Sequence, residues 1–295
     1  MPCPLDFSGL WIPLITPFTG DAVGAVDHPA LTLLVKHYAA AGVSGFVACG
    51  STGEAAALDK SEQLAVLDTV LAAAGALPVM MGLSGYHLGQ TVAWVEELAH
   101  RPIAGLLVPP PHYIRPAQTG VVQWFTALAD ASTKPLIVYD IPYRTGCHIT
   151  PETLLTLAAH PNIQAIKDCG GDAGKTQTLI ADGRLQVLAG EDAQIYGTLA
   201  LGGAGAIAAS AHVCTAQFVQ VMRLLAQGDL QSARVLWQSL APLVDAVFAE
   251  PNPAVIKAVL AQQGFIQDGL RLPMMAASAS ATQRLLGAME RVIAV

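Results

Sequence analysis

Eight short apolar runs alternate with helix-like segments along the chain, and this rhythm limits the possible folds more than any other feature. The runs begin roughly every 20–35 residues, and most gaps between them hold an amphipathic segment. Because the runs are apolar nearly throughout, they predict strands covered on both faces in a parallel sheet. Eight such units favour an α/β TIM (β/α)8 barrel over a doubly wound sheet. The runs are Trp11–Thr16, Gly45–Cys49, Leu77–Gly82, Ile103–Val108, Pro135–Asp140, Ile163–Lys167, Leu185–Ala189 and Ala204–Ala209.

Several of the gaps carry helix-start signals as well as helical periodicity. Asp59 is followed three positions later by Glu62, which is the pattern of a capping box, and Thr150 precedes a proline in a first turn. These signals support helices in the gaps. The clearest helical segments are Pro29–Ala41, Ser61–Ala74, Gly89–Ala99, Thr119–Ala131 and Pro151–Ala159.

The strand signal stops after about Cys214, and only helical segments follow it. We therefore expect a barrel with the active site over residues 1–214 and an all-helical C-terminal extension over residues 215–295. No low-complexity linker separates the two parts, so the extension is expected to pack on the barrel. The helical segments are Gln217–Gln227, Leu230–Phe248, Pro253–Gln263 and Pro273–Ala294.

Composition restricts the class of protein. Hydrophobic residues make up 53% of the chain and charged residues 13%, which predicts a large core. The net charge of −7 argues against nucleic acid and against a basic membrane patch as partners. The first residues lack a basic start and an apolar stretch, and no apolar window is long enough to span a membrane. The five scattered cysteines are expected to be reduced thiols, so we predict a cytoplasmic globular protein.

Lys167 is the single lysine of the six that lies inside an apolar run. Burying an ammonium group is costly and lowers its pKa, which leaves a nucleophilic amine suited to Schiff-base chemistry with a carbonyl substrate. The alternative is a lysine whose head reaches solvent at the end of its strand. The other lysines lie in mixed or polar contexts, where we expect solvated ammonium groups: Lys36, Lys60, Lys134, Lys175 and Lys257.

Further candidates follow from the rule that TIM-barrel active sites lie at the carboxyl ends of the strands. Gly50, Ser51 and Thr52 follow the second run and offer hydroxyls and free amides to a small carboxylate. Tyr139 ends the fifth run and can move protons, while Arg144 suits a second carboxylate. The alternatives are an ordinary turn with a helix cap after the second run and a packing role for the tyrosine.

Metal catalysis is the competing chemistry. Three histidines lie near strand ends, but they lack paired ligand spacing, and no phosphate-binding glycine loop opens a helix after a strand. We therefore expect no metal site and no cofactor, only a covalent imine through Lys167. The histidines are His112, His148 and His212.

Three motifs in this order resemble the dihydrodipicolinate synthase/N-acetylneuraminate lyase family: Gly50-Ser51-Thr52-Gly53-Glu54, Tyr139-Asp140-Ile141-Pro142-Tyr143-Arg144-Thr145-Gly146 and Ile166-Lys167-Asp168. The similarity runs over almost the whole chain. The resemblance implies a class I, pyruvate-dependent lyase or aldolase on a TIM barrel, usually a homotetramer built as a dimer of dimers.

The resemblance also implies roles for individual residues. Lys167 matches the Schiff-base lysine, and Tyr139 matches the proton-shuttling tyrosine. Ser51 keeps the hydroxyl of a catalytic relay that Tyr113 completes from a neighbouring subunit. Arg144 matches the arginine that holds the carboxylate of aspartate semialdehyde. The remaining substrate-binding candidates are Gly50, Thr52, Gly190 and the carbonyl group of Ile207.

Three functions are compatible with these residues. The first is a lyase that condenses pyruvate with aspartate semialdehyde in lysine biosynthesis. The second is an aldolase or dehydratase that acts on a sugar-derived 2-oxo acid, and the third is a non-catalytic protein that binds an oxo acid. Tyr143, Ala208 and His212 depart from what is usual in the synthases, so the second substrate stays open at this point.

Overall fold

The computed structural model describes residues 5–20 and 24–294. Its eight strands form a closed barrel in the order of the chain, which confirms the predicted TIM barrel. The chain divides into two compact units. One, here called the β3–β8 unit, comprises Met1–Ser8 and Pro78–Ile207; the other, the β1–β2 unit, comprises Gly9–Leu77 and Ala208–Val295. The predictions about Cys3 and the N-terminal start fall on residues 1–4, outside the described part.

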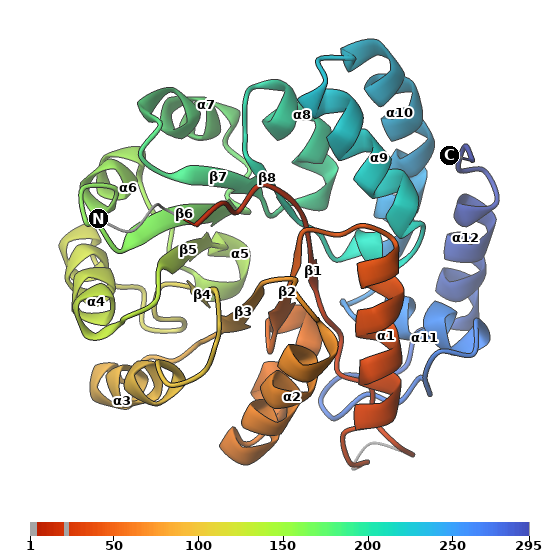
Figure 1. Cartoon of the computed structure of the whole chain (residues 1–295), viewed down its shortest axis with the longest axis horizontal. Coiled ribbons are helices and arrows are strands. Elements are labelled where there is room, and N and C mark those ends of the chain that lie inside the picture. Colours follow the sequence, from red (N-terminus) through yellow and green to blue (C-terminus); the bar gives the residue numbers. More distant parts are fainter. Residues whose placement is uncertain (1–4, 21–23, 295) are drawn as a thin grey trace. The chain divides into compact units, whose positions relative to one another are not determined.

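In the β3–β8 unit each strand pairs in parallel with the next one along the chain. Helices lie on the outside of these strands (Figure 1). The strands are β3 (Val79–Gly82), β4 (Gly105–Val108), β5 (Leu136–Asp140), β6 (Ile163–Asp168), β7 (Gln186–Ala189) and β8 (Gly205–Ile207). The helices are α3 (Leu88–Leu98), α4 (Gln118–Ala131), α5 (Pro142–Thr145), α6 (Pro151–Leu157), α7 (Ala173–Asp182) and α8 (Ile195–Ala200).

The β1–β2 unit contains the first two strands and the C-terminal helices. β1 pairs in parallel with β2, and α12 packs against α10 and α11 (Figure 1). The elements are β1 (Gly9–Pro13), α1 (His28–Ala40), β2 (Gly45–Ala48), α2 (Lys60–Ala73), α9 (Thr215–Ala226), α10 (Leu230–Val247), α11 (Ala254–Gln262) and α12 (Ala279–Met289). The predicted four C-terminal helices are therefore confirmed, while the boundary at residue 214 stays a prediction.

Local signals in the sequence explain where several helices begin. The Asp59 carboxylate accepts from the Glu62 backbone N–H, and the Glu62 side chain accepts from the Asp59 N–H, so the predicted capping box is formed. Helix α12 begins at Ala279, six residues later than predicted, because the Ser278 side chain caps it by accepting from the Ala281 N–H.

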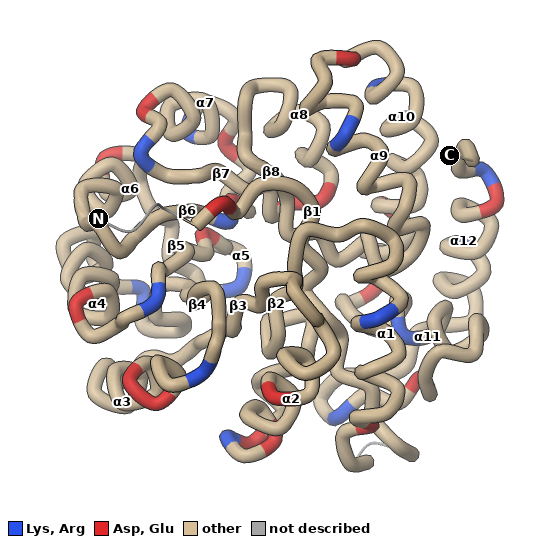
Figure 2. The backbone as a smooth tube through the Cα atoms, viewed as in Figure 1, with Lys and Arg blue, Asp and Glu red and all other residues tan. Residues whose placement is uncertain are grey.

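Charged residues are almost absent from the strands (Figure 2). Across the eight strands, all of which lie in the described part, only Asp140, Lys167 and Asp168 are charged, and they stand at the ends of β5 and β6. The prediction that Lys175 and Lys257 are solvated is wrong, because they are 1% and 0% exposed. Lys175 pairs with Asp140, 35 positions away, and Lys257 pairs with Glu54 near the start of the chain, so these pairs leave no local pattern.

His212 is a fully buried histidine whose hydrogen bonds require the neutral ring. It lies in the β1–β2 unit, where its Nδ1 donates to the Ala209 carbonyl oxygen over 2.8 Å. Its Nε2 accepts from the Ile15 backbone N–H over 3.2 Å, which a protonated ring cannot do. Burial lowers the pKa of His212 to about 4, against a slight opposing effect of the bond to Ala209.

We expect His212 to weaken the fold as the pH falls. In the unfolded chain the His212 ring binds a proton near pH 6.5, whereas in the folded chain the ring stays neutral down to about pH 4. The unfolded state therefore binds more protons between these values, and the free energy of unfolding falls by up to about 3 kcal/mol. Denaturant unfolding of the wild type and His212→Gln at pH 7 and pH 4.5 measures this loss. The glutamine amide can accept from Ile15 without titrating, so equal losses in both proteins would contradict the expectation.

Candidate active site

Lys167 and Tyr139 lie opposite each other on the neighbouring strands β6 and β5. The Lys167 Nζ donates to the Tyr139 hydroxyl over 3.4 Å and lies 4.4 Å from the centroid of its ring. Both side chains are buried, with 5% and 8% exposed. Because burial removes the hydration of the ammonium group, the pKa of Lys167 lies below its usual value. This arrangement favours a neutral amine beside a phenol that can exchange protons with it.

Gly190 leaves the space that the Lys167 side chain occupies. Its backbone N–H donates to the Asp168 carbonyl oxygen over 2.9 Å, which fixes the start of the loop after β7. A Cβ atom at Gly190 would lie 2.6 Å from the Lys167 Cγ and 2.5 Å from the Cys169 Sγ. Such distances are too short for carbon and sulfur, so glycine is required for this position of Lys167.

Titratable groups surround Lys167 within the same unit. Burial has the largest effect and lowers the pKa of Lys167. Among the neighbouring groups, Arg144 also lowers this pKa, whereas Cys169, Asp192 and Glu191 raise it. Burial also raises the pKa of Glu191, although Lys167 and a hydrogen bond from the Tyr143 hydroxyl oppose this rise. Arg144 and Tyr143 are exposed residues of α5. The hydrogen bond between Glu191 and Tyr143 was not foreseen from the sequence.

Tyr113 projects from the proline-flanked loop after β4. Its side chain is 89% exposed, and its backbone has a φ of +73°, in the left-handed region. Its N–H donates to the Thr145 carbonyl oxygen over 3.3 Å, so the loop is hydrogen-bonded to the end of α5. The predicted role of Tyr113 in a neighbouring subunit stays a prediction.

Ile207 is the last residue of β8 and is fully buried. A role of this carbonyl in binding substrate remains a prediction.

The motif from Gly50 to Glu54 follows β2 in the β1–β2 unit. Ser51 and Thr52 begin a short 3-10 turn, with Gly50 as its cap. The Thr52 side chain is buried, and its Oγ1 accepts from the Asn252 Nδ2 over 2.9 Å. Ser51 is half-buried. The turn thus lies at the carboxyl end of a barrel strand, and the binding of a substrate carboxylate by its hydroxyls remains a prediction.

Buried charges in the C-terminal extension hold the end of this motif. Glu54 has a φ of +54°, a conformation that is unfavourable for a residue with a side chain. Its Oε1 lies 2.5 Å from the Lys257 Nζ, and its Oε2 accepts from the Arg271 N–H over 3.2 Å. Lys257 also donates to the Gly269 carbonyl oxygen over 2.8 Å. These contacts stabilise the turn, whereas the sequence had predicted a solvated Lys257.

The predicted residues thus divide between the two units. Lys167, Tyr139, Arg144, Gly190 and Ile207 belong to the β3–β8 unit, together with Tyr113. Gly50, Ser51 and Thr52 belong to the β1–β2 unit. A single site that contains both sets remains a prediction.

Metal-binding clusters, membrane-spanning helices and the state of the cysteines also help to define the kind of functional site. Within residues 5–20 and 24–294, no cluster of three or more histidine, cysteine or acidic side chains could hold a metal ion. Over the same residues, no helix has the length and apolar character needed to cross a membrane. Cys49, Cys147, Cys169 and Cys214 are free thiols, as predicted.

Comparisons with known proteins give a consistent result. The family model described as "Dihydrodipicolinate synthetase family" matches residues 6–291. The chain is 36% identical over 285 residues to 4-hydroxy-tetrahydrodipicolinate synthase 2 of Clostridium acetobutylicum, covering 95% of this chain and 99% of that protein. It is 39% identical over 282 residues to the 4-hydroxy-tetrahydrodipicolinate synthase of Limosilactobacillus fermentum, covering 94% of this chain and 89% of that one.

Solved structures of the same kind resemble the chain over nearly its full length. The chloride-inhibited dihydrodipicolinate synthase of Acinetobacter baumannii, solved with pyruvate, has a TM-score of 0.93 at 30% identity, and the match covers 97% of this chain and 99% of that one. A monomeric dihydrodipicolinate synthase variant has a TM-score of 0.93 at 28% identity, with 99% of each chain covered.

The position of Gly190 leads to a test of how tightly Lys167 is held. We expect Gly190→Ala to displace the Lys167 side chain and to slow its reaction with a small 2-oxo acid by about tenfold or more. The rate is measured by borohydride trapping and mass spectrometry of the peptide that carries Lys167. Gly197→Ala is the matched control, since nothing lies within 4 Å of a Cβ atom added there. Equal rates in the two variants would show that Gly190 does not constrain the lysine.

Proposed function

The chain belongs to the dihydrodipicolinate synthetase family, and we propose that it is a class I lyase that condenses pyruvate with aspartate semialdehyde through an imine on Lys167. The observation that carries this proposal is the contact of the buried Lys167 amine with the Tyr139 hydroxyl. The relatives named above are synthases for the product of this condensation, and one similar structure is described as a complex with pyruvate.

The first half of the reaction forms the imine. The neutral Lys167 amine attacks the ketone carbon of pyruvate, and the carbinolamine loses its oxygen as water to give the iminium ion. Tyr139 accepts and returns protons during these steps, in a relay that Ser51 and the Tyr113 of a neighbouring subunit complete. Thr52, Gly50, Gly190 and the carbonyl group of Ile207 line the pyruvate site, and the hydroxyls bind its carboxylate.

The second half joins the two substrates. Loss of a proton from the methyl group of the iminium ion gives an enamine, whose terminal carbon attacks the aldehyde of aspartate semialdehyde. The aldehyde oxygen takes up a proton, and the amine of the semialdehyde then attacks the imine carbon and displaces Lys167, which frees the cyclic product and the lysine amine. Arg144 binds the carboxylate of the semialdehyde bidentately; it is exposed, and its charge acts on Lys167 by lowering the lysine pKa. The protein needs no added cofactor, because the protonated imine formed on Lys167 is the electron sink.

The other two candidate functions have weaker support. A sugar-derived 2-oxo acid would be held by hydrogen bonds to its hydroxyl groups. The N-acetylneuraminate lyases have an acidic residue and a serine where this chain has Ala193 and Ala209, whose side chains form no hydrogen bonds. The relatives reported above carry the synthase name instead. A non-catalytic binder would not need an amine with a lowered pKa against a phenol.

The proposal extends to the assembly and its location. We infer a homotetramer, built as a dimer of dimers, in which Tyr113 reaches a neighbouring site; its 89% exposure supports this role. We infer a cytoplasmic enzyme, in keeping with the free thiols of the described cysteines.

Reduction with borohydride tests the imine directly. In the presence of pyruvate we expect an irreversible adduct on Lys167 of the wild type and none on Lys167→Ala, because only a protein amine forms a reducible imine. Mass spectrometry of the digested protein locates the adduct. Lys36→Ala, which removes an exposed lysine, is the matched control and should be trapped as fast as the wild type. A wild type that carries no adduct would refute the class I mechanism.

The second substrate is tested at Arg144. We expect Arg144→Lys to raise the KM for aspartate semialdehyde about tenfold or more, since a charged hydrogen bond contributes about 1.5–3 kcal/mol. Trapping of pyruvate should be unchanged, and Arg234→Lys, at an exposed position on α10, should behave as the wild type. The same assay is run with N-acetylneuraminate and with deoxy-sugar acids. Turnover of a sugar acid without turnover of the semialdehyde would favour the second candidate function.

A further inference from the structure

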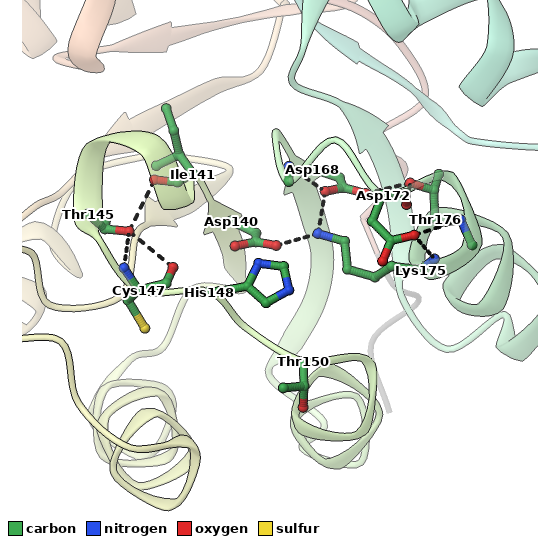
Figure 3. Close-up of polar contacts among 12 residues, drawn as sticks. Asp140, Ile141, Thr145, Cys147, His148, Thr150, Asp168, Asp172, Lys175 and Thr176 are labelled. Carbon is green, nitrogen blue, oxygen red and sulfur yellow. Dashed lines mark hydrogen bonds and ion pairs between the residues drawn. The ribbon is translucent and has the colours of Figure 1, made fainter.

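Three charged residues form a buried cluster behind the reactive pair. Tyr139 and Lys167 are register partners on β5 and β6, and the next pair in the register is Asp140 with Asp168. Successive side chains of a strand point to opposite faces. The two aspartates therefore point away from the Lys167 amine, toward α7, where Lys175 stands between them (Figure 3).

The contacts of this cluster tie the two strands together. The Lys175 Nζ forms ion pairs with the Asp140 Oδ2 and, at 2.7 Å, with the Asp168 Oδ1. The Thr176 hydroxyl donates to the Asp168 Oδ2 over 2.7 Å. The side chains of Lys175 and Asp140 are fully buried, and that of Asp168 is 3% exposed. One ammonium group thus joins the last residues of both strands that carry the reactive side chains.

The chain after β6 leaves room for this ammonium group. A Cβ atom at Gly170 would collide with the Lys175 Nζ and would lie 2.9 Å from the Asp140 Oδ2. Gly170 also donates from its N–H to the Asp168 Oδ1 over 2.9 Å. The Asp172 carboxylate caps α7 and accepts from the Lys175 N–H over 3.1 Å. Both ends of the lysine are therefore fixed.

Stability alone does not explain such a cluster. Two carboxylates share one ammonium group, and within the described part of the chain the Asp140 Oδ1 has no hydrogen-bond partner. Buried ion pairs are often no more stabilising than well-packed apolar residues of the same volume, because desolvation offsets their attraction. What a bridged pair supplies and an apolar contact does not is a directional constraint on the two strand ends.

We propose that Lys175 is a positioning residue that fixes the Lys167 amine against the Tyr139 hydroxyl by joining Asp140 to Asp168. The inference rests on the proposed imine chemistry and goes beyond it, since Lys175 touches no substrate. The backbone carries the effect: the Asp168 carbonyl oxygen accepts from the Gly190 N–H over 2.9 Å, and the Asp140 carbonyl oxygen accepts from the Cys169 N–H over 2.8 Å. The residues around Lys167 thus depend on the same two strand ends.

The experiment compares graded variants of the cluster with a control on the same helix. The variants are Lys175→Met, Thr176→Val, which removes one hydroxyl, and Thr176→Ser, which keeps it. Leu179→Ala is the control, since Leu179 is a buried residue of α7 outside the cluster. For each folded variant we measure the rate of borohydride-trapped imine formation as a function of pyruvate concentration, the thermal midpoint, and the distance between the Lys167 Nζ and the Tyr139 Oη in a crystal structure.

We expect Lys175→Met to slow imine formation about tenfold or more at saturating pyruvate, with half-saturation unchanged. Thr176→Val should slow it severalfold and Thr176→Ser should not. In both slow variants the distance of 3.4 Å should lengthen. Leu179→Ala should lower the thermal midpoint and leave the rate and the distance unchanged.

Other results would overturn the proposal. A folded Lys175→Met or Thr176→Val with the wild-type rate and distance contradicts it, and so does an equal loss of rate in Leu179→Ala. If Lys175→Met does not fold, the comparison of Thr176→Val with Thr176→Ser decides. A triple variant that combines Lys175→Met with Asp140→Asn and Asp168→Asn then tests the loss of the lysine without leaving unpaired charges. A wild type without a pyruvate adduct would overturn the proposed function instead, and the crystallographic distance in Thr176→Val would still decide the role of the cluster.

Discussion

The contact of the buried Lys167 amine with the Tyr139 hydroxyl is the interaction on which the rest of the proposed site depends. An ammonium group in this position has lost its hydration, so the neutral amine is favoured, and the phenol lies within hydrogen-bond distance of it for proton exchange. Gly190 leaves the space for the side chain, and the parallel register of β5 and β6 brings the two residues side by side. The proposed chemistry follows from this local geometry and from the family of the chain.

Buried lysines recur in this protein, and each has a different environment. Lys167 has a phenol as partner and a lowered pKa. Lys175 lies between two carboxylates, whose attraction outweighs the cost of burial and raises its pKa. Lys257 pairs with one carboxylate, Glu54, and burial leaves its pKa below the usual value. The same side chain is thus proposed as a nucleophile in one place and ties elements together in two others, according to the number of carboxylates beside it.

Prediction from the sequence succeeded where the signal was local. The apolar runs gave all eight strands, and the capping box at Asp59 gave the start of α2. The segments that were not assigned are short or polar. Helix α5 has only four residues, and the buried face of α7 includes Lys175 and Thr176, which count as polar in a sequence pattern. Lys175 was predicted to be solvated because its two partner carboxylates lie 35 and seven positions away along the chain, so no local pattern shows the pairing.

The sequence by itself determined the barrel, because a periodic alternation of apolar runs and amphipathic segments has few packed solutions. It also singled out Lys167, because an ammonium group inside an apolar run has to be neutralised or paired. Only the tertiary structure decided what each buried charge meets. The Tyr139 hydroxyl reaches the Lys167 amine through strand register, and Asp140 and Asp168 reach Lys175 through the packing of α7 on the outer face of the strands. Contacts of this kind depend on three-dimensional proximity, which no spacing along the chain encodes.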